Sequence, residues 1–118
     1  MELRVVARDA DAARLAGEGA LASVPGAGPD ELLKGLRALV PFDRTVLLDL
    51  SRVDAFDSSG VSWLLLAHDT FAKGGGRLIL HSLSRRLDDV LNVVGLSSVF
   101  HLAGDEASAL ALAREAPR

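Results

Sequence analysis

The sequence predicts an α/β fold with a mixed, mainly parallel sheet. Short apolar runs that suit buried strands alternate with longer segments whose leucines recur at helical spacing, through most of the 118 residues. Such alternation implies right-handed crossovers, which make neighbouring strands parallel. The length lies within the usual range of about 50–250 residues for one domain. A single domain over residues 1–118 is therefore expected.

The N-terminal part predicts a hairpin, a loop and a helix. Leu3 to Ala7 and Ala13 to Gly17 have strand-like composition around a polar turn, which indicates two strands at a sheet edge. Gly17 to Pro29 is rich in glycine, alanine and proline and is predicted to be a loop. Pro29 to Leu39 begins with a proline and two acidic residues and repeats leucine at helical spacing, so it is predicted to be a helix.

The centre of the chain predicts a buried strand, a short loop and the start of a second helix. Thr45 to Leu50 is almost entirely apolar, which suits a strand covered on both faces. One of Asp57, Ser58 and Ser59 is expected to cap the helix that follows, by accepting a bond from a backbone N–H. Gly60 would allow close approach to neighbouring backbone in the first turn.

The second half continues the same alternation. The second helix has Val61, Leu64, Leu65, His68 and Phe71 along one predicted face and ends at a run of three glycines, one of which can take the left-handed cap. After it we expect a strand over Arg77 to His81, a helix over Arg85 to Val94, a short strand around Val99 to Leu102, and a last helix that opens with Asp105.

Composition and charge exclude several classes of function. The net charge is −3 and the basic residues are dispersed apart from Arg85 and Arg86, so nucleic-acid binding is not expected. The absence of cysteine excludes disulfides, thiolate catalysis and cysteine-bound metal. The apolar run from Trp63 to Ala67 is far shorter than the ~20 residues of a membrane span. No signal peptide is recognisable, and a cytoplasmic protein is expected.

The polar residues before the second helix allow two interpretations that do not exclude each other. In the first, Asp57, Ser58 and Ser59 form a helix cap. In the second, one hydroxyl is a phosphoacceptor, because a phosphate at a helix N-terminus meets free N–H groups and the favourable end of the dipole. A nucleophilic serine is disfavoured, since Phe56 occupies the position where the pattern G-x-S-x-G needs glycine before Ser58. An enzyme is therefore not expected.

Other candidate sites are weaker. The run of three glycines follows a helix and lacks the lysine of a phosphate-binding loop. His68, His81 and His101 show no close pairing in the sequence and make a poor metal site, so no cofactor is expected. Trp63 is either a core residue or, if it is exposed beside the serines, a binding anchor.

Three stretches resemble a known family. They are Asp49 to Val61, Gly74 to Leu78 and Leu91 to Leu96, and together they resemble a STAS domain of the bacterial anti-sigma-factor antagonists, from about Thr45 to Leu112. The resemblance implies a four- to five-stranded sheet flanked by about four helices. It also implies partner switching: the unmodified protein binds an anti-sigma factor that is a serine kinase, phosphorylation reverses this binding, and a serine phosphatase resets it.

The resemblance implies site residues. By the motif, Ser58 is the phosphoacceptor and Ser59 the second choice, and the partner-binding residues are Asp57, Ser58, Ser59, Gly60, Trp63 and Glu18. Gly17 and Glu18 resemble the family's glycine-glutamate turn, but Ala20 replaces its usual aspartate.

Two alternatives remain open. The first is a structural STAS subunit of a larger lipid-transport or stress-signalling assembly. The second is a STAS variant that binds a nucleotide.

Overall fold

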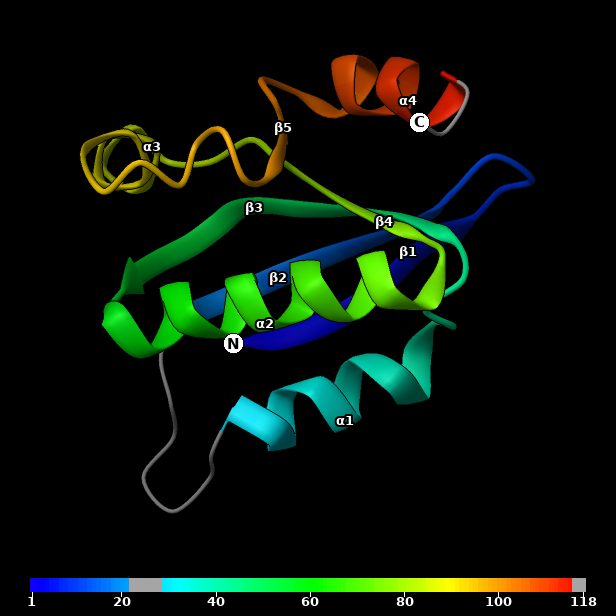
Figure 1. Ribbon diagram of the computed structural model, residues 1–118, viewed down its shortest axis with the longest axis horizontal. Helices are drawn as coiled ribbons and strands as arrows, with labels where there is room; N and C mark the ends of the chain where they lie inside the picture. The colour runs from blue at the N-terminus through cyan, green and yellow to red at the C-terminus, as the bar shows by residue number, and fades with distance from the viewer. Residues whose placement is uncertain (22–28, 116–118) are drawn as a thin grey trace.

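The computed structural model describes residues 1–21 and 29–115. The elements are shown in Figure 1: β1 (Glu2–Arg8), β2 (Ala13–Leu21), α1 (Pro29–Leu39), β3 (Thr45–Phe56), α2 (Ser58–Gly74), β4 (Arg77–His81), α3 (Arg85–Val93), β5 (His101–Ala103) and α4 (Glu106–Arg114). The predicted alternation of strands and helices is confirmed.

The strands of the described ranges form one sheet in the order β1-β2-β3-β4-β5. β1 pairs with β2 in antiparallel orientation, and each later pair is parallel. The parallel pairs follow from the helical connections between their strands, since a tight hairpin joins only antiparallel neighbours. The predicted edge hairpin and the mixed, mainly parallel sheet are both confirmed.

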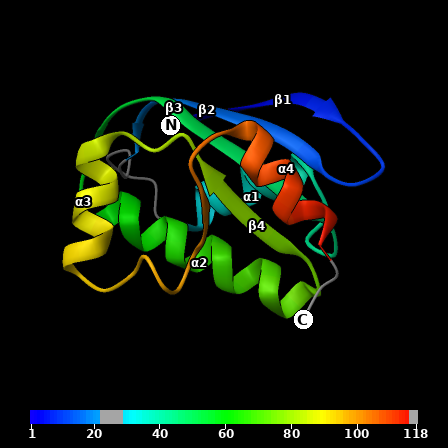
Figure 2. The same cartoon turned by 90° about the horizontal axis from the view of Figure 1, so that it is seen from above.

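Helices cover both faces of the sheet (Figure 2). α1 and α2 lie on one face and α4 lies across β3, β4 and β5 on the other. The alternation of side chains along β3 explains this arrangement, because Val46, Leu48 and Leu50 belong to the larger core and Leu47 packs with Ala109 of α4. Thr45 to Leu50 is thus covered on both faces, as its composition predicts.

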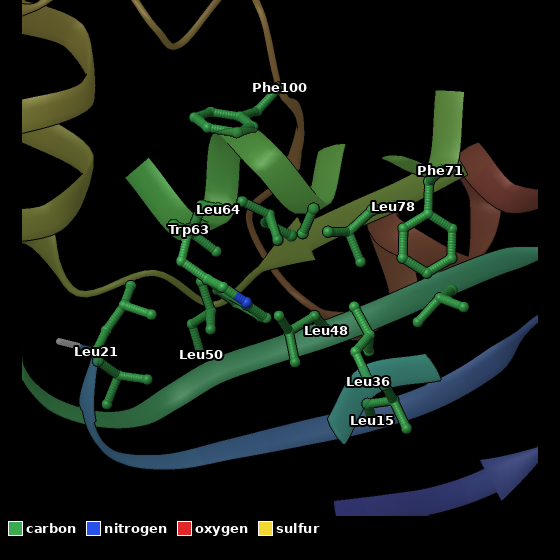
Figure 3. Packing of buried hydrophobic residues seen from close by; sticks show 14 of the residues in the cluster. Leu15, Leu21, Leu36, Leu48, Leu50, Trp63, Leu64, Phe71, Leu78 and Phe100 are labelled. Carbon is green, nitrogen blue, oxygen red and sulfur yellow. The ribbon is translucent and has the colours of Figure 1, made fainter. Parts of the chain in front are cut away.

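The larger core lies between α2 and the sheet (Figure 3). Trp63, Leu64 and Phe71 of α2 pack over the leucines of β3 and β4 and are at most 1% exposed. The buried stripe of α2 runs through Gly60, Trp63, Leu64, Ala67 and Phe71. Leu65, which is predicted to share a face with Leu64 and Phe71, lies outside this stripe and is 39% exposed.

Two strands are longer than the sequence predicts. β2 continues through Gly17 to Leu21, and β3 continues through Ser51 to Phe56, although the sequence predicts a loop for both stretches. The two extensions pair with each other up to Leu21 and Phe56, with shifts of register on the way. The hydrogen bonds between the two strands thus stabilise stretches whose amino-acid composition does not favour a strand in isolation. The rest of the predicted loop, residues 22–28, lies outside the described residues.

Smaller differences occur near the C-terminus. β5 covers only His101 to Ala103, so Val99 and Phe100 precede it, and the ring of Phe100 is buried in the larger core. α3 ends one residue early, at Val93. Within the described residues, no helix combines the length and hydropathy needed to cross a membrane.

The glycine run ends α2 as expected. Gly75 has a φ of 87° in the left-handed region, its N–H donates to Ala72 O, and the N–H of Gly76 donates to Phe71 O over 2.9 Å. These two bonds form a Schellman motif.

Candidate functional site

The candidate site is the serine corner, which we define as residues 57–60. It lies where β3 ends and α2 begins, at the left of Figure 1. The backbone N–H of Asp57 donates to Leu21 O, the last residue of β2, over 3.3 Å. The corner is thus held at the carboxyl end of two parallel strands, the edge where open α/β sheets usually carry function.

Asp57 is the residue that caps α2. Its backbone is extended, and its carboxylate accepts from the N–H of Gly60 over 3.0 Å and from the hydroxyl of Ser59. These hydrogen bonds hold the pKa of the Asp57 carboxyl below its ordinary value. The bond from the Ser59 hydroxyl has the largest effect and the bond from the Gly60 N–H the second largest. Asp57 therefore carries a negative charge at neutral pH.

Gly60 joins the start of α2 to the end of β2. A Cβ built on Gly60 would lie 1.8 Å from Leu21 O and 2.5 Å from Leu21 C. Only a residue without a side chain allows this approach, as the sequence predicts. Leu21, whose carbonyl also accepts from the N–H of Asp57, is a site residue that the sequence does not indicate, because its stretch has the composition of a loop.

The two serines of the corner have different environments. Ser59 is half-buried and its hydroxyl donates to Asp57, so it is part of the cap. Ser58, the first residue of α2, is exposed, and its hydroxyl has no hydrogen-bond partner among the described residues. Ser58 is therefore the hydroxyl of the pair that is open to solvent and to a second protein.

An arginine lies beside the serine corner. The guanidinium of Arg86, in the first turn of α3, lies 5.7 Å from the centroid of the Phe56 ring, and Phe56 precedes Asp57 in the chain. This distance is within the range of a cation–π contact. The sequence places Arg86 far from Phe56, so the contact follows from the fold alone.

Glu18 lies on β2 and not in a turn, which corrects the prediction for Gly17 and Glu18. Its carboxylate forms ion pairs with Arg4 of β1 and Arg52 of β3, each over 3.3 Å. The side chain is 38% exposed. The strand register places Glu18 opposite Glu2 of β1 and Arg52 of β3. Glu18 therefore belongs to a row of charged side chains across three strands. A contact of Glu18 with a partner remains a prediction.

Trp63 is a core residue. Its side chain is 1% exposed and lies between α2 and the sheet, close to Leu50 in Figure 3. The first of the two sequence interpretations is therefore the right one. The exposure beside the serines on which the role of binding anchor depended is therefore not met. A partner-binding role for Trp63 stays a prediction.

Two of the three histidines lie close together in the fold, although they show no close pairing in the sequence. The rings of His68 on α2 and His101 on β5 are 5.4 Å apart, and Phe100 lies edge-on to His68 at 5.6 Å. His81 is separate: it is buried at the end of β4, with Nδ1 2.9 Å from the Ser82 hydroxyl. In the part of the chain that the structure describes, no group of three potential metal ligands occurs.

Comparison with known proteins agrees with this architecture. Residues 6–109 match the sequence model of the STAS domain. A candidate anti-sigma factor antagonist, BtrV of Bordetella bronchiseptica, is 34% identical over 77 residues, which cover 64% of this chain and 66% of that protein. The match therefore spans slightly less than two thirds of the relative.

Solved structures have the same fold. A candidate anti-sigma factor antagonist of Thermotoga maritima superposes with a TM-score of 0.77 at 16% identity, over 97% of this chain and 94% of that one. A STAS domain protein of Planctomyces limnophilus gives a TM-score of 0.74 at 21% identity, over 96% and 98%. The family match covers most of the sequence and the fold agrees along almost its whole length, so the chain belongs to the STAS domain family.

Proposed function

We propose that the chain is an anti-sigma factor antagonist that is switched by phosphorylation of Ser58. The unmodified protein binds an anti-sigma factor that is also a serine kinase, and the sigma factor is released. Phosphorylation ends this binding, and a serine phosphatase restores it. The protein acts in the cytoplasm as a binding module without enzymatic activity or cofactor. Membership of the STAS family and the description of the Bordetella relative support this proposal.

The observation that carries the choice of Ser58 is the different environment of the two serines. The Ser59 hydroxyl donates to Asp57, so phosphoryl transfer to Ser59 would first break this hydrogen bond at the cap of α2. The Ser58 hydroxyl is exposed and, among the described residues, not hydrogen-bonded. A kinase can therefore reach Ser58 without unfolding the helix start.

Charge explains how one phosphate would act as a switch. A phosphoserine carries about −1.5 to −2 charges at neutral pH. At Ser58 it would lie at the positive end of the α2 dipole, so the fold tolerates it. It would also stand next to the ionised Asp57 and raise the negative charge of the corner from −1 to about −2.5 to −3. A partner surface that fits the unmodified corner then has to desolvate this charge, which typically lowers affinity by about 100-fold or more.

The test compares four forms of the full chain: wild type, Ser58→Ala, Ser58→Asp and the matched control Ser59→Ala. Each is immobilised and incubated with lysate of the native host, and the retained proteins are identified by mass spectrometry. We expect wild type, Ser58→Ala and Ser59→Ala to retain an ATPase-fold kinase that Ser58→Asp does not retain. Incubation with the captured kinase and ATP should label wild type and Ser59→Ala but not Ser58→Ala.

Two results would contradict the proposal. Labelling of Ser58→Ala but not of Ser59→Ala would show that Ser59, and not Ser58, is the phosphoacceptor. Retention of the same transporter or scaffold subunits by all four forms would indicate the alternative function, a structural subunit of a larger assembly, with the serines acting only as part of the cap.

A further inference from the structure

A cavity lies at the opposite end of the sheet from the serine corner. It is formed where β1 turns into β2 and where α1 leads into β3, at the right of Figure 1. Its volume is about 370 Å³, and its lining residues are Arg8, Asp9, Ala10, Ala13, Val40, Pro41 and Arg44. We call it the hairpin cavity. Neither the STAS resemblance nor the proposed switch uses these residues.

Backbone carbonyls hold both arginines of the hairpin cavity in place. Arg8 Nη2 donates to Leu39 O, at the C-terminal end of α1, over 2.9 Å. Arg44 Nη2 donates to Asp9 O over 3.3 Å and to Ala10 O over 3.5 Å, both in the turn of the hairpin. A guanidinium has five N–H donors, so each of these arginines keeps donors for another acceptor.

The positive charge of the two arginines is not neutralised within the described side chains. Neither Arg8 nor Arg44 forms an ion pair there, whereas Asp9, the one carboxylate of the lining, pairs with Arg14 over 2.8 Å. Arg14 also pairs with Glu106 over 3.2 Å. The lining therefore offers two oriented cations, and its carboxylate already has a cationic partner.

The remaining lining is apolar. Ala13 and Val40 are buried, and Ala10 and Pro41 complete the wall. Ligand pockets are typically apolar with a few polar groups that fix the orientation of the ligand. Guanidinium groups match the planar oxygen pair of a carboxylate better than a single hydroxyl or an amine.

We propose that the hairpin cavity binds a small amphipathic carboxylate, whose anionic group is held by Arg8 and Arg44 and whose apolar body lies against Ala13, Val40 and Pro41. The cavity and the serine corner are at opposite ends of the strands, so the site can be occupied while a partner covers Ser58. This site is independent of the proposed switch: it gives the protein a small-molecule ligand in addition to its protein partner.

The test uses sodium benzoate as the probe and the ¹⁵N-labelled full chain. Benzoate is titrated while the backbone amide signals of Ala10, Ala13 and Val40 are followed by NMR. Benzyl alcohol tests the need for charge, and inorganic phosphate tests the need for an apolar body. We expect saturable shifts with benzoate, and affinities at least about tenfold weaker for both other probes.

Variants of the protein test whether Arg8 and Arg44 bind the carboxylate group of benzoate. Arg44→Gln and Arg8→Gln should each weaken benzoate binding about tenfold, because each removes a charge-assisted hydrogen bond. Arg52→Gln is the matched control, since this arginine is also exposed but lies on β3 outside the cavity, and it should bind like wild type.

Three results would overturn the proposal: no saturable shift of the three amides with benzoate, equal affinity for benzoate and benzyl alcohol, or equal affinity for benzoate and phosphate. These three are measured on the wild-type chain, so they hold even where a variant does not fold.

Discussion

Replacing Gly60 by alanine should break the contact between α2 and β2. The new Cβ would lie 1.8 Å from Leu21 O, and real Cβ contacts essentially never fall below 3.0 Å. The two backbones would thus have to separate by about 1.2 Å, the difference between these distances. The same movement would stretch the bond from Asp57 N–H to Leu21 O, which is already 3.3 Å long.

The magnitude follows from three contributions. Overpacking against backbone that cannot rotate away typically costs about 1–3 kcal/mol. Loss of one backbone hydrogen bond adds about 1 kcal/mol. Alanine in place of glycine in a helix returns up to about 1 kcal/mol. Gly60→Ala should therefore lower the free energy of unfolding by about 2 kcal/mol.

Urea unfolding followed by far-UV circular dichroism measures this change. Gly35→Ala is the matched control, because Gly35 is also helical but is exposed, and a Cβ there meets no atom within 4 Å. The control should raise the free energy of unfolding by about 0.5–1 kcal/mol. The same substitution should thus have opposite signs in α1 and α2.

One result would refute this reasoning. If Gly60→Ala is as stable as wild type while Gly35→Ala is stabilised, then the start of α2 does not lie against the backbone of Leu21. The serine corner would then be less closely held than the structure describes, and the position of Ser58 relative to β2 would not be determined by Gly60.

Three further perturbations test the core, the cap and the histidine pair. Trp63→Ala should lower the free energy of unfolding by about 3–5 kcal/mol in urea, because the buried indole leaves a large cavity. Ser59→Ala should raise the pKa of Asp57 towards its ordinary value in a carboxyl NMR titration, because the Ser59 hydroxyl is the main cause of the lowered pKa, whereas Ser58→Ala should not. The pKa of His101 is lowered below its ordinary 6.5, mainly by burial and then by the nearby charges of His68 and Arg77. The His101 imidazole therefore binds a proton more tightly in the unfolded chain than in the folded one. Stability should therefore fall as the pH is lowered from about 7 to about 5, and His101→Gln should reduce this fall.

Each of these predictions has a contradicting outcome. A cost below about 1 kcal/mol for Trp63→Ala would mean that the indole is not in the core. An Asp57 titration that responds to Ser58→Ala and not to Ser59→Ala would reverse the assignment of the two hydroxyls. Equal dependence of stability on pH in wild type and His101→Gln would show that another group is responsible.

Much of the fold was predictable because its causes are local. Alternating apolar runs and helical leucine spacing predicted the order of strands and helices. The glycine run predicted the left-handed cap at Gly75, since few other residues adopt that conformation. The sequence also predicted a cap at Asp57, Ser58 or Ser59 and a close approach at Gly60, because both roles depend on the type of residue at the start of a helix.

The tertiary structure decided what depends on partners distant in the sequence. The strand through Gly17 to Leu21 forms because β3, and at Gly17 and Glu18 also β1, offers it a ladder. The contact of His68 with His101 needs the sheet to bring α2 beside β5. Propensity and periodicity describe a segment by itself, whereas pairing, burial and side-chain proximity are properties of two segments together. For that reason the sequence alone determined that the corner holds two serines, and only the folded chain distinguished the exposed Ser58 from the cap residue Ser59.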